Sequence, residues 1–238
     1  MRGEKWLTLD KILECIKDFD FTNFCKDNDY ALDNMLPHEE GLATFEGATK
    51  FVIDYPSLDY VIKIPFRGYN DYLGNEDPSY DTDPNHYLWE PFEGANNNNY
   101  KLSEWDYCEA ESSTYDDIAY FENDYITQFF AKTSRIKCSF IDYPIYTQEK
   151  CELMQYPNRI PHAEVLTTQK IYEKTTKHHY TMDMRWFTLV REQYGEEILK
   201  ELFQVLETYN IRDLHGENVG FRKNGGGLVI FDYSSYFD

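Results

Sequence analysis

The fold of this chain is decided near its end, by Ile211–Phe221 (IRDLHGENVGF) and Leu228–Ser234 (LVIFDYS). The first stretch places Asp213 and Asn218 five residues apart in a polar loop, and the second is a short apolar run that leads to Asp232. Phosphoryl transfer needs carboxylate and amide oxygens on a magnesium ion, plus one carboxylate that orients the attacking hydroxyl group. Asp213, Asn218 and Asp232 are therefore candidates for a site of this chemistry.

A structural turn is the alternative interpretation of Asp213–Gly220, because Asp, Asn and Gly are all common in turns. The context favours the functional interpretation. A strongly amphipathic helix is predicted over Glu196–Tyr209 and ends just before the loop. A β-hairpin with the glycines Gly225–Gly227 in its turn is predicted after it. The 14 residues from Asn218 to Asp232 are enough for two short strands and a turn.

The surface is predicted to be strongly acidic. The 238 residues include 43 Asp and Glu against 23 Lys and Arg, which gives a formal net charge of −20. Such a surface repels nucleic acids and anionic membranes, so neither is an expected partner. A basic protein or a cation-bridged nucleotide is the expected partner instead. Aromatic residues make up 17% of the chain, too many for a disordered acidic tail, so the chain is predicted to fold.

The cysteines and the N-terminus indicate a cytoplasmic protein. The five cysteines are scattered and form no C-x-x-C pair, which favours reduced thiols over a disulfide or zinc framework. Met1–Trp6 lacks the apolar core of a signal peptide, and no apolar run is long enough to span a bilayer.

The expected order of elements is that of an α+β protein with two lobes. Residues 1–150 are expected to form a strand-rich N-terminal lobe, and residues 151–238 a helical C-terminal lobe. Arg67–Lys101, rich in Asn, Gly, Asp and Pro, is expected to be a peripheral loop insertion. The predicted helices are Asp10–Lys17, Glu104–Phe121, Thr181–Tyr194 and Glu196–Tyr209, and the predicted strands are Phe51–Ile53, Tyr60–Phe66, Ile136–Phe140 and Ile145–Gln148.

Lys63 interrupts the apolar strand Tyr60–Phe66 and has two interpretations. One is an exposed charge on an edge strand. The other is a buried lysine that pairs with nucleotide phosphates and with a helix glutamate. Gly41 and Gly47 precede this strand and could allow close approach of the backbone to phosphates, although glycines that flank a hairpin usually serve only the turns.

Glu111 is the expected partner of this lysine. It precedes Tyr115 by four residues and Ile118 by seven, which places it on the inward face of the predicted helix. Glu109 is the second choice, and a merely solvated glutamate is the alternative. His215 is predicted to pack in the loop or to lie near a phosphate, because no second His or Cys stands at metal-ligand spacing.

Taken in order, these residues resemble the nucleotide site of the protein-kinase-like superfamily. The chain is similar to small kinase-like proteins of bacteriophages and their bacterial relatives in three segments: G-A-T-K from Gly47, V-I-K-I-P around Lys63, and D-L-H-x-x-N-x-G followed by D-Y at Asp232. The resemblance implies a bilobal fold with a β-rich N-lobe, a truncated helical C-lobe, and ATP and Mg²⁺ between the lobes.

The resemblance also implies a role for each matching residue. Asp213 would orient the acceptor hydroxyl, while Asn218 and Asp232 would hold magnesium. Lys63 with Glu111 would position the phosphates, and Gly41 and Gly47 would lie beside the nucleotide.

Four departures from the family pattern leave two functions open. Ile211 replaces the usual His, His215 replaces Lys, Tyr233-Ser234 replaces Phe-Gly, and the chain ends at Asp238 without an A-P-E segment. The first function is an ATP-dependent phosphotransferase of a phage or mobile element that acts on a host or viral protein. The second is a non-catalytic interaction protein, either a pseudokinase or an acidic inhibitor that mimics nucleic acid.

Overall fold

The computed structural model describes residues 7–47, 49–66, 107–154, 160–178, 180, 182–223 and 226–233. It has the predicted α+β composition and divides into two compact units. The first unit is Met1–Cys108 with Arg135–Thr147, and the second is Glu109–Ser134 with Gln148–Asp238. The predicted insertion Arg67–Lys101 lies outside the described residues. Among the helices described, none combines the length and the apolar character needed to cross a membrane.

The first unit begins with the predicted N-terminal helix, α1 (Leu9–Ile16). The helix starts one residue earlier than expected, because the side chain of Thr8, and not that of Asp10, accepts the capping hydrogen bond from the Lys11 amide. Its apolar face, Ile12, Leu13 and Ile16, is buried. Two 3₁₀ turns (Phe21–Asn23 and Lys26–Asn28) and the short helix α2 (Asp29–Asp33) follow.

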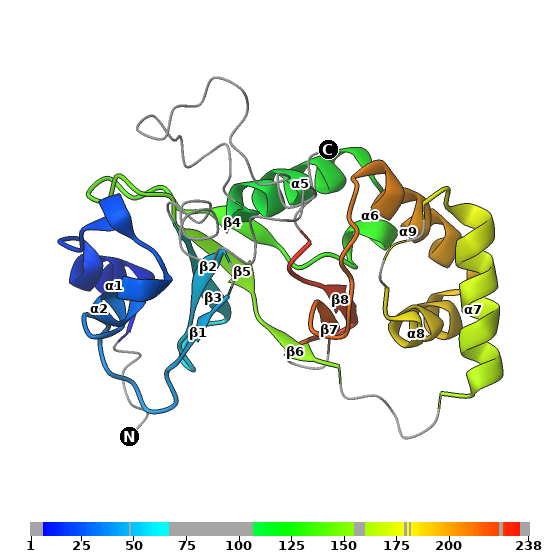
Figure 1. The fold of residues 1–238 in the computed structure, drawn as a ribbon, viewed down its shortest axis with the longest axis horizontal. Helices are drawn as coiled ribbons and strands as arrows, with labels where there is room; N and C mark the ends of the chain where they lie inside the picture. The colour runs from blue at the N-terminus through cyan, green and yellow to red at the C-terminus, as the bar shows by residue number, and fades with distance from the viewer. Residues whose placement is uncertain are drawn as a thin grey trace, which may run out of the picture. The chain divides into compact units, whose positions relative to one another are not determined.

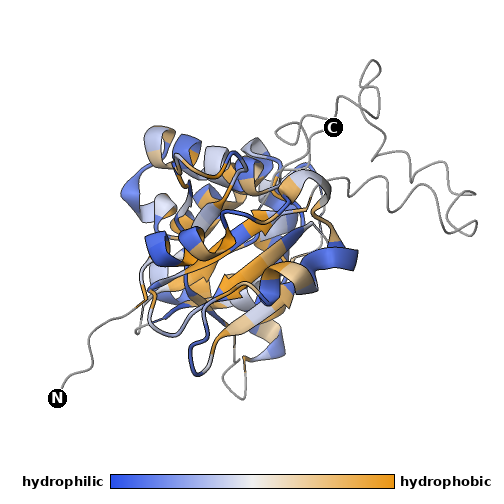
Figure 2. Ribbon diagram, turned by 90° about the vertical axis from the view of Figure 1, so that its left-hand side faces the viewer, coloured by the Kyte–Doolittle hydropathy of each residue, from blue (hydrophilic) through white to orange (hydrophobic). Residues whose placement is uncertain are grey.

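Three antiparallel strands follow α2, one more than predicted for this region. They are β1 (Ala43–Glu46), β2 (Lys50–Asp54) and β3 (Tyr60–Pro65). With β4 (Thr133–Arg135) and β5 (Tyr146–Glu149) they form a sheet in the order β1-β2-β3-β5-β4. In Figure 2 the strands of this sheet are largely orange, the colour of hydrophobic residues, whereas many helical turns are blue. The sheet therefore supplies much of the apolar surface of the first core.

The strand predicted over Ile136–Phe140 is wrong. The ladder ends after β4, with a last hydrogen bond from the Ile136 amide to the Ile145 oxygen. Phe140 projects into solvent at 46% exposure, so the apolar pattern of this stretch does not report a buried face. The core of the unit is instead closed by Tyr143, whose ring stacks on Phe21 with 4.6 Å between centroids.

Most of the helices among the described residues belong to the second unit. They are α5 (Tyr107–Phe121), α6 (Asp124–Thr127), α7 (His162–Thr175), α8 (Met184–Tyr194) and α9 (Glu196–Thr208). In Figure 1, α7, α8 and α9 lie together beside the strands β7 and β8. The sequence predicted that the N-terminal lobe comprises residues 1–150. In the structure, residues 109–134 belong to the second unit instead, because Ile118, Ile126 and Phe129 are part of its core.

Gly195 separates α8 from α9, as the sequence predicted. Its φ of 93° is disfavoured for residues with a side chain, and its amide closes the last turn of α8 on the Arg191 oxygen. Helix α7 was not predicted. Only Thr168, Ile171 and Tyr172 are buried along its 14 residues, too few to give a clear apolar periodicity.

A three-stranded antiparallel sheet completes the second unit, with β6 (Cys151–Leu153), β7 (Val219–Arg222) and β8 (Leu228–Ile230) in that order. Strands β7 and β8 confirm the predicted hairpin. Gly220 is required where β6 and β7 pair, because a Cβ atom there would lie 2.0 Å from the main-chain oxygen of Glu152.

Candidate functional site

Two buried apolar side chains anchor the loop between α9 and β7 in the core. Ile211 and Leu214 are buried in the core of the second unit. The Ile211 amide bonds to the Leu206 oxygen at 2.8 Å, and the Leu214 oxygen accepts a bond from the Asp183 amide at 2.8 Å. Between and after these anchors, the side chains of Asp213 and His215 remain 44% and 41% exposed. The loop therefore presents two polar side chains on a rigid base.

Asn218 closes this loop. Its side-chain Nδ2 donates to the main-chain oxygen of Asp213 at 2.8 Å, and its amide donates to the His215 oxygen at 2.9 Å. The side chain is almost fully buried. Because Nδ2 is engaged in the loop, Oδ1 is the atom of this amide suited to face a cation.

Asp232 follows β8 at the same end of the hairpin. The Phe231 amide donates to the Asn218 oxygen at 2.9 Å, which places Asp232 next to the residue paired with Asn218. The φ of Asp232 is 60°, in the left-handed region that non-glycine residues seldom adopt. Such a conformation persists only where surrounding contacts hold it.

Tyr233 supplies such a contact. Its ring is buried edge-on against Phe130, with 5.4 Å between centroids. Its hydroxyl lies 2.6 Å from the Ala131 oxygen, to which it donates, and 3.3 Å from Thr133 Oγ1. Burial raises the pKa of this phenol well above its ordinary value. The residue after Asp232 is therefore fixed in the core of the unit.

Glu111 lies in a buried polar group next to Tyr233. It is fully buried on α5, which confirms the inward face predicted for it and excludes the solvated alternative. Gln148 Nε2 donates to Thr133 Oγ1 at 2.7 Å and to Glu111 Oε2 at 3.5 Å. Buried polar side chains are stable when they are connected in this way.

The proton of His215 can be assigned from its neighbours. The Glu217 amide donates to Nδ1 at 3.2 Å, so Nδ1 carries a lone pair. The neutral ring therefore holds its proton on Nε2, which lies 3.7 Å from Asp213 Oδ2. His215 thus accepts a hydrogen bond within the loop and lies beside the carboxylate of Asp213.

Lys63 belongs to the first unit. It is 4% exposed, and its strand β3 lies inside the sheet between β2 and β5, opposite Val52. The interpretation as an exposed edge charge is therefore wrong. Burial of a lysine in a sheet costs free energy unless its ammonium group is paired.

Gly41 and Gly47 lie in turns of the first unit. Gly41 has a φ of 84°, and a Cβ there would meet the Pro56 ring at 3.1 Å, so the turn before β1 requires glycine. Gly47 stands in the connection from β1 to β2, where its amide bonds to the Lys50 oxygen at 2.9 Å. Both glycines therefore stand in turns, Gly41 before β1 and Gly47 between β1 and β2.

The structure thus brings together one group of the predicted residues. Asp213, Asn218, Asp232 and Glu111 belong to the second unit and are linked by the contacts above, whereas Lys63, Gly41 and Gly47 belong to the first. The convergence of Lys63, Glu111, Asp213, Asn218 and Asp232 on one cleft stays a prediction.

The sequence did not indicate the residue that links the β7–β8 hairpin to the segments around Phe130 and Glu149. Arg222, at the end of β7, donates through Nε to Glu149 Oε1 at 2.9 Å and through its terminal nitrogens to the oxygens of Phe130 and Gln128. Its partners are between 73 and 94 residues away in the sequence, so no local pattern could have indicated them.

The donor set fits magnesium in one specific way. Among the residues described, no three Asp, Glu, His or Cys side chains gather as a self-sufficient metal site. Magnesium at nucleotide sites usually takes one or two protein ligands, and phosphate and water oxygens complete its shell. One carboxylate from Asp232 and one amide oxygen from Asn218 are compatible with that pattern.

Comparison with known proteins does not assign this chain to a family. No protein-family model matches the chain, and neither does any curated protein or solved structure.

Proposed function

We propose that this protein is a kinase-like phosphotransferase that binds ATP with magnesium. The observation that supports this best is the loop closed by Asn218. Its base is buried, its main chain is bonded to itself, and the carboxylate of Asp213 stands half exposed on top. Catalytic side chains are commonly presented in this way, on loops that a rigid scaffold positions.

The second unit would hold the metal and the reacting hydroxyl. Asp213 would accept a hydrogen bond from the acceptor hydroxyl, orient it and receive its proton. Asn218 Oδ1 and the carboxylate of Asp232 would hold magnesium. A magnesium ion bound there would neutralise charge on the transferred phosphoryl group.

His215 fits this proposal as a neighbour of the reacting hydroxyl. In the neutral tautomer that accepts from the Glu217 amide, the ring turns its Nε2–H toward Asp213 Oδ2, 3.7 Å away.

The first unit would hold the nucleotide. Lys63 would meet the phosphates, and Glu111, a residue of the second unit, would orient this lysine. Gly41 and Gly47 would allow the backbone to approach the nucleotide. The acceptor is proposed to be a protein hydroxyl, because a net charge of −20 favours association with basic proteins over nucleic acids.

A non-catalytic interaction protein is the second candidate, and the same net charge of −20 is the observation that favours it. An acidic chain can compete with nucleic acid for a basic surface without any chemistry. Such a protein would have no need for a buried Lys63 or for a positive φ at Asp232.

Calorimetry of the full chain with ATP distinguishes these candidates. We expect binding with magnesium and a loss of affinity when EDTA removes it. Transfer is then followed with ATP labelled on its γ-phosphate, using the protein itself and a basic test protein as acceptors. Absence of ATP binding would contradict the proposal, and binding without transfer would assign the protein to the non-catalytic class.

A further inference from the structure

The turn that joins α5 to α6 carries an unusual concentration of exposed aromatic side chains. Tyr120, Phe121 and Tyr125, which we term the aromatic corner, are 81%, 70% and 68% exposed. The rings of Tyr120 and Phe121 meet edge to face with centroids 4.8 Å apart. The core of the unit does not need them, because Ile118 and Ile126 of the same two helices fill it. Clustered exposed rings of this kind are typical of interaction surfaces.

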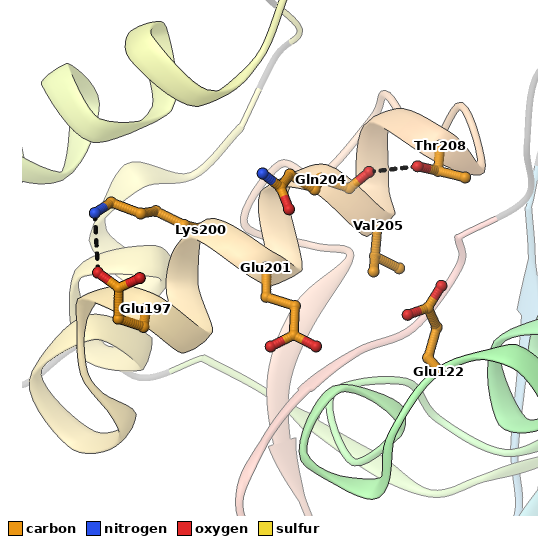
Figure 3. A pocket seen from close by; sticks show the side chains of 7 residues that line it. All are labelled: Glu122, Glu197, Lys200, Glu201, Gln204, Val205 and Thr208. Atoms are coloured by element: carbon orange, nitrogen blue, oxygen red, sulfur yellow. Dashed lines mark hydrogen bonds and ion pairs between the residues drawn. The ribbon is translucent and has the colours of Figure 1, made fainter.

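An acidic pocket of about 590 Å³ opens beside this turn. Figure 3 shows that Glu122 reaches it from the end of α5, whereas the other lining side chains project from α9. Three carboxylates, those of Glu122, Glu197 and Glu201, line it against a single ammonium group, that of Lys200. Figure 3 shows Val205 between the polar groups, so the wall also has an apolar part.

The ammonium group of Lys200 is already engaged. Its Nζ lies 2.8 Å from Glu196 and 3.0 Å from Glu197. Glu201 is fixed by Asn123, whose Nδ2 donates to its Oε1 at 2.5 Å and so joins the pocket to the turn that bears the aromatic corner. The carboxylates of Glu122 and Glu201 thus leave the pocket negative. The pKa of nearby Tyr209 is raised, first by burial and then by the carboxylate of Glu122.

We propose that the aromatic corner and the acidic pocket together dock a basic segment of a partner protein, with an arginine in the pocket and an apolar neighbour on the rings. A guanidinium group carries five donors in a planar fork that matches carboxylates, and the pocket supplies these carboxylates. The exposed rings of the aromatic corner supply apolar surface for the neighbouring side chain. The net charge of −20 steers such a segment toward the protein.

A metal ion is a poorer fit for this pocket. Within the described part of the chain no three acidic, histidine or cysteine side chains converge as metal ligands. A lysine would fit less well than an arginine, because its ammonium is strongly hydrated and does not bridge two carboxylates in a plane.

The test measures fluorescence anisotropy of the full chain with a short fluorescein-labelled peptide that alternates arginine and leucine. Two further peptides carry lysine for arginine or serine for leucine. We expect the arginine–leucine peptide to bind tightest, and each replacement to weaken it by about tenfold, because charge and ring contacts both contribute.

Matched variants separate the site from the general charge of the protein. Glu122→Gln with Glu201→Gln removes two charges from the pocket, and Asp27→Asn with Asp59→Asn removes two exposed charges from the first unit. We expect a loss of about tenfold only in the first pair. The double variant Tyr120→Ser with Phe121→Ser should also weaken peptide binding. Tyr30→Ser is its control and should leave binding unchanged, because Tyr30 is 66% exposed but lies outside the aromatic corner.

Equal losses in the pocket pair and the control pair would overturn the proposal, because binding would then reflect net charge alone. Equal affinity for all three peptides would overturn it as well. Neither measurement involves nucleotide, so failure of the docking surface and failure of the phosphotransferase proposal are observed separately.

Discussion

Asn218 donates a hydrogen bond of 2.8 Å from its side chain to the main-chain oxygen of Asp213, five residues earlier. This bond turns a polar stretch into a closed loop, and because it engages Nδ2 it leaves Oδ1 as the acceptor atom of the Asn218 side chain. The same residue pairs through its own main-chain oxygen with the Phe231 amide, beside Asp232. One side chain therefore links the shape of the loop to the arrangement of the proposed metal ligands.

Replacement of Asn218 by Asp should destabilise the protein even without ligands. The carboxylate cannot donate to the Asp213 oxygen, and a nearly buried charge would replace the amide, so we expect a loss of about 1–3 kcal/mol in the free energy of unfolding. Urea denaturation measures it. Asn34→Asp is the matched control, because Asn34 donates through the same atom to the Tyr30 oxygen at an exposed site. Equal losses in both variants would show that the loop does not depend on Asn218.

Replacement of Asp213 by Asn should abolish transfer and leave ATP affinity nearly unchanged. The carboxylate would act on the acceptor hydroxyl and not on the nucleotide, and loss of a general base lowers rates by about 10²- to 10⁴-fold. Labelled-phosphate transfer and calorimetry on the same preparation check both parts. Retained transfer in this variant would remove Asp213 from the proposed chemistry.

Replacement of Asp232 by Asn should affect binding instead. We expect magnesium-dependent ATP affinity to fall by about tenfold or more, because one charged ligand is lost while the amide can still accept hydrogen bonds. Titration of ATP at several magnesium concentrations measures this. Folding should not suffer, since Asn tolerates the φ of 60° observed at this position. An unchanged magnesium dependence would argue against this metal ligand.

Replacement of Lys63 by Ala should impair ATP binding and transfer together, because phosphate positioning would be lost. Lys50→Ala is the matched control. Lys50 is also buried, at 6% exposure, and lies on the neighbouring strand β2 of the same sheet. If both variants lost ATP affinity to the same degree, the effect would reflect damage to the sheet and not a specific contact.

The buried tyrosines should make the fold sensitive to alkali. Burial raises the pKa of Tyr233 and that of Tyr172 above the ordinary value of 10.0, so the folded protein keeps these protons when the unfolded chain releases them. Stability is therefore full below about pH 10 and falls as the pH rises from there toward the folded pKa. The Tyr233→Phe variant should be less stable than the original protein at neutral pH, because it lacks the hydrogen bond to the Ala131 oxygen. Its free energy of unfolding should fall less between pH 9 and about pH 11, because no phenol is left at this position to ionise. Denaturation at several pH values tests the slope.

Local patterns predicted a definite part of this structure. The apolar stripe of α9, the glycine that separates it from α8, and the β7–β8 hairpin were all correctly placed. Each depends on residues within a few positions of one another, so the chain specifies them before it folds. The D-x-x-x-x-N…D residues also lie where the sequence predicted them, in a loop after α9 and at the end of the β7–β8 hairpin.

Burial of the charged residues could not be decided in this way. Lys63 fitted an edge strand as well as an interior one, and only the pairing of β3 with β5 excluded the edge. Glu111 fitted a solvated helix face until the contact with Gln148, 37 residues later, was known. Helix α7 escaped detection because its few buried residues acquire their partners from α8 and α9.

The sequence alone therefore determined the periodic elements, the acidic surface and the order of the chemically competent residues. Tertiary structure decided which atoms of those residues are already engaged in hydrogen bonds within the protein. The Tyr233 hydroxyl meets the Ala131 oxygen across 102 residues of sequence, and this contact fixes the residue that follows Asp232. Hydrogen-bond direction and desolvation depend on atoms that folding brings together, and for that reason they cannot be obtained from spacing along the chain.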